Sequence, residues 1–296
     1  MARFHPVETT GRIYRNVYVI GDVHGSLDGL QAILEHAELL NRDGRWSGRL
    51  AQVVQCGDVV DRGPDSQECL DLLLNLRREA RRAGGCVDLL VGNHELALAQ
   101  GDYSISDLPR PEALGAQLAK LIRRGRLQAA RAYRQYLMTH AGVSTELMRY
   151  LIAELRKKSE HRITVAALAR HLNQELKAAF LKDDFSHPMF HVGPARGGSH
   201  SRGGVFWADF DFDHDTVSRH PEIWQIFGHT PPSNGGAPFR VSPDARRINI
   251  DVGICGRYGG YRAYVKVLPD RIVGIHCGES QFEEEILAAV EEPVPA

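Results

Sequence analysis

The hydrophobic positions in the first third of the chain follow two alternating patterns. Short apolar runs at residues 16–20, 51–56 and 87–91 predict β-strands. Leucine and isoleucine recur at helical spacing after Ser26, a residue type that caps helices, and again over residues 66–83. Strands that alternate with helices in this way predict βαβ units and a parallel sheet.

The middle of the chain is predicted to be mainly helical and its last third to be rich in strands. Residues 112–134 are rich in Ala, Leu and Arg and predict a helix, followed by a short strand at residues 136–138. Residues 144–180 predict more helix. We expect this stretch to form a helical cap, inserted at about residues 144–190 into a single domain that spans residues 1–296. The remaining predicted elements are a loop at 184–204, strands at 223–227, 247–252 and 261–267, and a short C-terminal helix at 283–295.

Composition narrows the class of protein. A chain of 296 residues that is 43% hydrophobic can bury a full core. Its 36 basic and 37 acidic residues give a net charge of −1, which argues against a nucleic-acid-binding surface and against a nuclease. No stretch approaches the roughly 20 apolar residues of a membrane span.

Location is predicted from the cysteines and the N-terminus. The five cysteines include no CxxC pair, which favours free thiols in a reducing compartment. Residues 1–15 lack the apolar region of a secretory signal. We therefore expect a cytoplasmic protein.

Glycine-flanked polar boxes follow the three predicted parallel strands: Gly-Asp-Val-His-Gly at 21–25, Gly-Asp-Val-Val-Asp-Arg-Gly at 57–63 and Gly-Asn-His-Glu at 92–95. Asp22 and Asp58 are 36 positions apart, and Asp58 and Asn93 are 35 apart, which suits successive βαβ units. Ligands gather beyond the carboxyl ends of parallel strands, where all three boxes are expected. Carboxylate, amide and imidazole groups together suit divalent ions, and two such ions roughly 3.5–4 Å apart hydrolyse phosphate esters.

The first two boxes supply candidate metal ligands and a phosphate contact. Asp22 and His24 lie two apart, so extended backbone would point both side chains the same way as half of a metal site. An isolated Asp-x-His pair is more often a turn with an unrelated histidine, but two further boxes at matching intervals disfavour that interpretation. Asp58 is the candidate carboxylate shared by two ions. Arg62 offers a planar fork to a phosphoryl group. The alternative is that Asp61 and Arg62 form a local ion pair that closes the turn, a pair that would still allow Arg62 to face the substrate.

The later boxes supply the other candidates. Asn93 offers an amide oxygen to the second ion, and His94 is a candidate general acid whose tautomer Asp61 fixes and whose pKa it raises. Glu95 is expected to hold backbone groups. His140 and His229 each follow a short apolar strand, as ligands on neighbouring strand ends would, although either one alone would be an ordinary loop histidine.

The order GDVHG, GDVVDRG, GNHE, HAG, FGHT resembles the phosphoprotein phosphatase branch of the calcineurin-like metallophosphoesterases, and the last box is similar to its bacterial members. The resemblance implies an α/β (α+β) fold, a four-layer α/β/β/α sandwich. It also implies two metal ions, one held by Asp22, His24 and Asp58, the other by Asp58, Asn93, His140 and His229. In this family pattern His94 donates a proton with support from Asp61, and Arg62 binds phosphate.

Three features need comment against the family pattern. The glycine pair after the fourth-box histidine is Ala141-Gly142 here, and residues 206–209 (Phe-Trp-Ala-Asp) resemble the Trp-Ser-Asp segment of eukaryotic members. The family uses a second phosphate-binding arginine, for which the sequence offers four candidates: Arg196, Arg202, Arg219 and Arg257.

The expected function is dinuclear-metal-dependent phosphoester hydrolysis by direct attack of a hydroxide that bridges the ions. The preferred substrate is a Ser/Thr phosphoprotein, with tyrosine as an extension; the alternative is a small phosphoester such as a diadenosine polyphosphate. A third hypothesis is a non-catalytic metal-binding adaptor, which predicts damaged ligands, and none is missing. Manganese is the expected metal, with iron or zinc as options.

Overall fold

The computed structural model describes residues 16–158, 163–215, 219–220, 222–232, 237–278 and 283–289. Residues 1–15, on which the absence of a signal segment was argued, lie outside this range, as does residue 290 onward.

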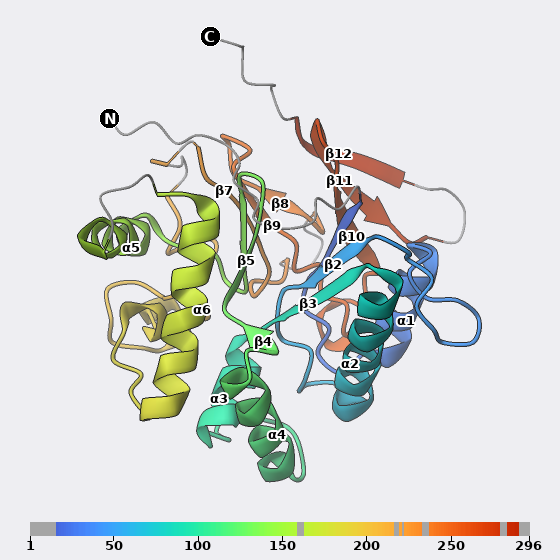
Figure 1. The fold of residues 1–296 in the computed structure, drawn as a ribbon, viewed down its shortest axis with the longest axis horizontal. Coiled ribbons are helices and arrows are strands. Elements are labelled where there is room, and N and C mark those ends of the chain that lie inside the picture. The colour runs from blue at the N-terminus through green and yellow to red at the C-terminus, as the bar shows by residue number, and fades with distance from the viewer. Residues whose placement is uncertain are drawn as a thin grey trace.

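One sheet has seven strands and contains the predicted βαβ units. Its order is β12-β11-β10-β1-β2-β3-β4, with β1 to β4 parallel and β10 to β12 antiparallel. Helices α1 (Leu27–His36) and α2 (Ser66–Ala83) connect β1 to β2 and β2 to β3, and lie on the outer side of this sheet (Figure 1). The strands are β1 (Val17–Ile20), β2 (Gln52–Gln55), β3 (Cys86–Leu90), β4 (Leu127–Gln128), β10 (Ala263–Val267), β11 (Arg271–His276) and β12 (Glu283–Ala289).

The second sheet has five strands in the order β5-β6-β7-β9-β8, of which β6, β7 and β9 are parallel. Helices α5 (Thr145–Lys158) and α6 (Val165–Lys182) lie on the opposite side of the molecule from α1 and α2, so the predicted four-layer α/β class is confirmed (Figure 1). The strands are β5 (Ala130–Tyr133), β6 (Tyr136–Thr139), β7 (Trp224–Phe227), β8 (Arg240–Val241) and β9 (Arg247–Asn249).

Apolar side chains from both sheets form one continuous core. Val19 and Val53 of the first sheet are fully buried, as are Leu137, Ile226 and Ile248 of the second. β1, Val-Tyr-Val-Ile, is buried at every position and is a continuous apolar run, as is typical of parallel strands covered on both faces.

The remaining elements lie in the connections. Helix α3 (Asn93–Gln100) begins in the third box, and α4 (Pro111–Arg123) follows a ten-residue loop. Three short 3₁₀ helices, η1 (Pro188–Phe190), η2 (Pro194–Arg196) and η3 (Gly256–Tyr258), lie in the later loops.

Two predicted helices are wrong in part or whole. The helix expected over 112–134 ends at Arg123, because Gly125 adopts a left-handed conformation (φ 63°) and the chain turns into β4 and β5. The helix expected from residue 283 is β12, the outer strand beside β11. Both segments are rich in helix-forming residues, but hydrogen bonding to a neighbouring strand outweighs propensity differences of under about 1 kcal/mol per residue.

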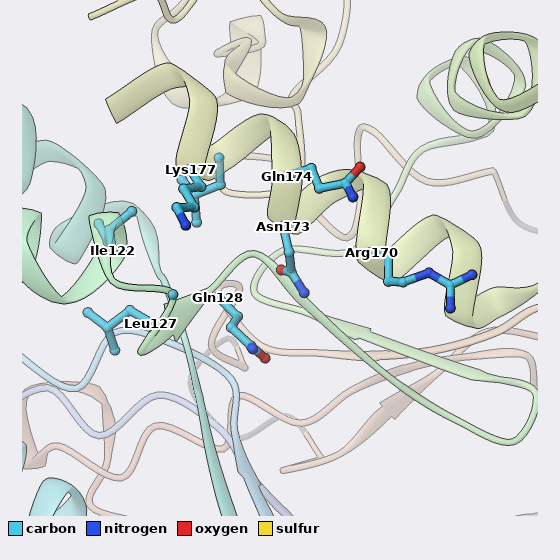
Figure 2. A pocket seen from close by; sticks show the side chains of 9 residues that line it. Ile122, Leu127, Gln128, Arg170, Asn173, Gln174 and Lys177 are labelled. Atoms are coloured by element: carbon cyan, nitrogen blue, oxygen red, sulfur yellow. The ribbon is translucent and has the colours of Figure 1, made fainter. Parts of the chain in front are cut away.

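A cavity of about 270 Å³ lies between α4, β4 and α6, away from the boxes. Figure 2 shows that its basic side chains, Arg170 and Lys177, extend toward opposite sides of the cavity. They therefore do not converge on one anion. Among the residues that the structure describes, no helix has both the length and the apolar character needed to cross a membrane.

Candidate metal centre

The carboxyl ends of parallel strands from both sheets meet in one place, and each end contributes a buried polar side chain. Every residue predicted as a metal ligand is brought to this place and is at most 6% exposed. These residues are Asp22 after β1, His24 in the same loop, Asp58 after β2, Asn93 after β3, His140 after β6 and His229 after β7.

The Asp58 carboxylate lies between two sets of candidate metal-ligand atoms. Its Oδ2 is 3.5 Å from His24 Nε2 and 3.5 Å from His140 Nε2. Asp58 belongs to two groups of residues whose metal-capable atoms lie within 4.8 Å of one another. The groups are His24–Asp58–His94 and Asp58–His140–His229. Asp22 lies beside the first group, with Oδ2 4.0 Å from His24 Nε2.

The ring orientations leave lone pairs facing one another. His24 Nδ1 donates to the Val60 carbonyl (3.2 Å) and His140 Nδ1 donates to the Cys56 carbonyl (2.9 Å), since a carbonyl can only accept. In the neutral rings Nε2 is then an acceptor. Yet His140 Nε2 is 2.9 Å from Asn93 Oδ1 and 3.5 Å from Asp58 Oδ2, which are acceptors too. Acceptors at these distances repel unless a cation lies among them, so this donor set fits divalent metal ions.

The titration behaviour of the buried carboxyl groups fits the same conclusion. Burial, and then the charges of Asp251 and Asp58, raise the pKa of Asp22 well above its ordinary value. Burial and the Asp58 charge raise the pKa of Glu95 to about 7, and burial raises that of Asp251 to about 7 as well. Carboxyl groups crowded in this way need positive charge in order to ionise together, and bound cations provide it.

The imidazoles of the site are held in their neutral, ligand-competent form. Burial lowers the pKa of His24 to about 4 and also lowers the pKa values of His140 and His229. His229 Nδ1 is 3.1 Å from His140 Nε2, and its buried Nε2 has no hydrogen-bond partner among the described residues. Neutral imidazole is the form that binds metal.

The backbone reaches this geometry through strained turns, which the sequence did not predict. β1 ends at Ile20 and His24 has φ 48°, so the expectation that Asp22 and His24 converge along extended backbone is wrong. Asp58 (φ 52°) and His229 (φ 73°) are also left-handed. Such conformations cost about 1–3 kcal/mol each and persist only where their surroundings impose them.

Glu95 provides part of that support. Its Oε2 accepts from the N–H groups of Asp58 (2.7 Å) and Gly92 (2.8 Å), and its Oε1 accepts from those of Val59 (2.8 Å) and Val60 (3.0 Å). The prediction that Glu95 holds backbone groups is confirmed. Gly92 is required because an added Cβ would lie 2.0 Å from Asp58 Oδ1.

His94 and Arg62 lie together on one side of the cluster. His94 Nδ1 is 2.9 Å from Asp61 Oδ2. Burial would lower the pKa of His94, but Asp58 and the hydrogen bond to Asp61 outweigh it, so the pKa is raised. Arg62 Nη2 is 3.4 Å from His94 Nε2, and its ion pair is with Asp107, not Asp61, so the local Asp61–Arg62 pair is excluded.

The structure places two site residues that sequence reasoning missed. Asp251 follows β9 and lies beside Asp22; a carboxylate between a strand and a glycine is the signal that identified the other boxes. The Tyr258 ring lies 5.4 Å from that of His24, and its hydroxyl interacts with Arg62. Nothing in the sequence around Tyr258 distinguishes it.

The four candidate arginines separate clearly. Arg196 Nη2 lies 2.8 Å from Asp209 Oδ2, 3.1 Å from Thr230 Oγ1 and 3.5 Å from the His229 carbonyl, so it is beside the cluster. Arg257 shares Asp107 with Arg62. The other two lie elsewhere: Arg202 donates to the Phe212 carbonyl and Arg219 pairs with Asp215 on the surface.

Comparison with known proteins agrees with this geometry. The model of the calcineurin-like phosphoesterase family matches residues 15–233. Shewanella-like protein phosphatase 2 of Arabidopsis thaliana is 43% identical over 84 residues, 28% of this chain and 22% of that protein. The symmetrical bis(5'-nucleosyl)-tetraphosphatase of Pseudomonas syringae is 32% identical over 178 residues, 56% of this chain and 52% of that protein. The chain thus spans about half or less of the length of these two relatives.

Solved structures show the same fold. The cold-active protein-tyrosine phosphatase of a psychrophilic Shewanella species superposes with a TM-score of 0.68 at 21% identity, covering 94% of this chain and 81% of that one. A protein serine/threonine phosphatase of Saccharomyces cerevisiae gives a TM-score of 0.51 at 16% identity, covering 96% and 82%. The family match over most of the chain confirms the resemblance stated from the boxes: the chain belongs to the calcineurin-like phosphoesterase family.

Proposed function

We propose that this chain is a two-metal phosphoesterase that hydrolyses phosphomonoesters on serine and threonine side chains of proteins. The observation that supports it most directly is the position of Asp58 between two groups of donors whose lone pairs converge. The complete donor set also argues against the non-catalytic adaptor.

One ion would be held by Asp22, His24 and Asp58, and the other by Asp58, Asn93, His140 and His229. When bound, the pair of divalent cations would neutralise negative charge on the phosphoryl oxygens and would lower the pKa of the water that attacks phosphorus. We propose manganese as the resident metal, with iron and zinc as alternatives, because the ligands are oxygen and imidazole groups.

The phosphoryl group would be oriented by two arginines. Arg62 presents Nη2 beside His94 Nε2, and Arg196 lies beside His229. We therefore propose Arg196 as the second phosphate-binding arginine. Asp209 holds it there through an ion pair.

His94 would protonate the departing oxygen through Nε2. Asp61 accepts from Nδ1 and so fixes the ring, which leaves Nε2 aimed at the same region as Arg62 Nη2. The raised pKa of His94 keeps a larger fraction of the ring protonated at neutral pH, as a general acid requires.

The substrate proposal is supported by relatives that are named protein phosphatases. A second function, symmetrical cleavage of dinucleoside tetraphosphates, is favoured by relatives of that name that match a larger part of the chain, up to 56%. A cytoplasmic location is proposed on the five cysteines, all of which are free.

The two functions are separated by one panel of rates. The protein loaded with Mn²⁺ is assayed on phosphoserine, phosphothreonine and phosphotyrosine peptides and on diadenosine tetraphosphate. We expect kcat/KM to be highest on the phosphoserine or phosphothreonine peptides. Cleavage of the dinucleotide to two nucleoside diphosphates, with peptides left intact, would establish the second function instead.

A further inference from the structure

The loop between α3 and α4 contacts both Asp61, which orients the candidate acid His94, and the candidate phosphate-binding Arg62 through one residue, Asp107. Its backbone N–H donates to Asp61 Oδ1 at 2.8 Å, while the other oxygen of Asp61 accepts from His94. Its Oδ2 accepts from Arg62 Nη1 at 2.9 Å and from Arg257 Nη1 at 2.6 Å. One residue of this loop therefore touches both the carboxylate that orients the acid and the phosphate-binding arginine itself.

The donors of Arg62 are divided between the loop and the site. Nη1 donates to Asp107 and to the Ile105 carbonyl at 3.0 Å. Nη2 faces His94, and the buried Nε has no hydrogen-bond partner among the described residues. The Nε and Nη2 edge is the fork that binds an oxyanion with two parallel hydrogen bonds. The loop thus binds the Nη1 end of the guanidinium, and the Nε and Nη2 edge faces the site.

The ion pairs of Asp107 are too exposed to serve mainly as stabilising contacts. The Asp107 side chain is 48% exposed and that of Arg257 is 56% exposed, and exposed pairs stabilise a fold little. Arg62, by contrast, is only 18% exposed and lies in left-handed backbone (φ 69°). Without the carboxylate, two guanidinium groups that now share one oxygen would repel each other, and among the described residues only the Ile105 carbonyl and the Tyr258 hydroxyl would still hold Arg62.

We propose that Asp107 is a positioning residue for the reaction: by holding Nη1 of Arg62 it aims the Nε and Nη2 fork at the phosphoryl group beside His94. This inference rests on the proposed function. It assigns a role to an exposed aspartate that lies outside the boxes. Arg257 binds the same carboxylate oxygen as Arg62 does.

The test compares Asp107→Asn with Asp102→Asn in the protein loaded with Mn²⁺. Asp102 is an exposed aspartate of the same loop, and the hydrogen bonds of its carboxylate to the described residues come from Ser104 of that loop, through the N–H at 3.0 Å and the hydroxyl, so it is a matched control. Binding of inorganic phosphate is measured by calorimetry, and hydrolysis of p-nitrophenyl phosphate by kcat/KM. We expect Asp107→Asn to weaken phosphate binding and lower kcat/KM by about 10-fold each, the effect of losing one charge-assisted contact, with metal content unchanged and Asp102→Asn within about twofold of the parent.

A positioning role requires that the effect pass through Arg62. In an Arg62→Ala background, Asp107→Asn should change phosphate binding by less than about twofold, because sites that act through one contact are not additive. An equal effect in both backgrounds would show that Asp107 acts on the fold and would overturn the assignment. Tighter phosphate binding by Asp107→Asn would overturn it as well, because it would show that the carboxylate competes with phosphate.

Phosphate binding also separates this inference from the proposed function. If the parent hydrolyses no phosphoester but binds phosphate in a way that depends on Asp107 and Arg62, the function fails and the positioning role stands. If the parent hydrolyses phosphoesters and Asp107→Asn matches Asp102→Asn, the function stands and the positioning role fails. A parent that does not bind phosphate overturns the positioning role.

Discussion

The strand-end cluster around Asp58 and a second cluster beside helices α5 and α6, the helical cluster, both contain groups of three metal-capable side chains whose ligand atoms lie within 4.8 Å of one another. The second consists of Glu154 on α5, His171 on α6 and His187 before η1. Glu154 Oε2 lies 2.9 Å from His171 Nε2 and 3.2 Å from His187 Nε2. By composition, two histidines and a glutamate are as good a metal site as the first cluster.

The two clusters differ in the hydrogen bond that the histidine Nδ1 makes, on the side of the ring away from the cluster. His140 Nδ1 donates to a carbonyl, so Nε2 offers a lone pair to the cluster. His187 Nδ1 instead accepts from the Met189 N–H at 3.1 Å, so the proton of the neutral ring is on Nε2 and is donated to Glu154. The helical cluster is therefore satisfied by its own protons, whereas the strand-end cluster needs a cation. The ring nitrogen opposite the ligand atom decides which kind of site a histidine can form.

The largest expected effect is on bound metal. Asp58→Asn should remove metal and lower turnover by more than about 10⁴-fold, because Lewis-acid stabilisation is worth several kcal/mol and each 1.4 kcal/mol is tenfold. Glu154→Gln, a matched change in the helical cluster, should leave metal content unchanged. Elemental analysis of both purified variants makes the comparison, and loss of metal from Glu154→Gln would remove the distinction between the clusters.

The next effect separates metal binding from proton donation within the strand-end cluster. His94→Asn should retain both metals and lower turnover of an alkyl phosphomonoester by about 10²–10⁴-fold, the contribution of a positioned acid. With p-nitrophenyl phosphate, whose leaving group needs little protonation, the loss should be smaller. If His94→Asn hydrolysed the alkyl ester at the rate of the parent, the assignment of His94 as the general acid would be wrong.

A smaller effect is expected from the support of the Asp58 turn. In Glu95→Gln, the amide NH₂ would face two backbone N–H groups that now point at a carboxylate oxygen, and the turn would shift. We expect metal affinity to fall about 10–100-fold, as is typical when a group that orients a ligand is lost. Titration with Mn²⁺ measures it, with the exposed Glu112→Gln as the control; equal affinities in the two variants would contradict the role of Glu95.

The smallest effect is on stability and belongs to the helical cluster. Burial would raise the pKa of Glu154, but hydrogen bonds from His171 and His187 outweigh it and lower the pKa; the Tyr150 hydroxyl also bonds to this carboxylate. A lowered folded pKa means that the stabilisation is present above the ordinary value of 4.5 and is lost as pH falls through the folded pKa.

Glu154→Gln should therefore lower stability at neutral pH by about 1 kcal/mol, or Tm by about 2–4 °C. Thermal denaturation from pH 3 to 7 checks the sign: the difference between parent and variant should shrink as pH falls below 4.5. A difference that grows toward acid pH would show that the histidine charges, not the carboxylate, dominate the cluster.

Local sequence predicted the βαβ half of the fold well. The helix expected over 66–83 is α2, Ser66–Ala83, because its apolar stripe and a glycine at its end specify both its existence and its boundary. β12 could not be predicted in the same way. Glu283–Ala289 is composed of helix-forming residues, and only its pairing with β11, itself missed, makes it a strand.

Some residues of the candidate site could likewise be predicted from local sequence, and others could not. The boxes identified the residues that converge at the strand ends, because chemistry that needs carboxylate, amide and imidazole at strand ends leaves a pattern in the sequence. Asp107 and Tyr258 left no such pattern, and the sequence did not separate Arg196 from three other candidate arginines. They approach the cluster from loops whose course depends on packing far from them in sequence.

The sequence by itself determined which side chains are available and at which strand ends they emerge, since strand and helix periodicity are local properties of the chain. The tertiary structure decided the rest: which ring nitrogen faces the cluster, which carboxylates are close enough to repel, and which arginines share a carboxylate. These depend on distances of a few ångströms between segments as far apart as Asp22 and His229, and on the strained backbone at His24, Asp58 and His229 that only the packed surroundings hold in place.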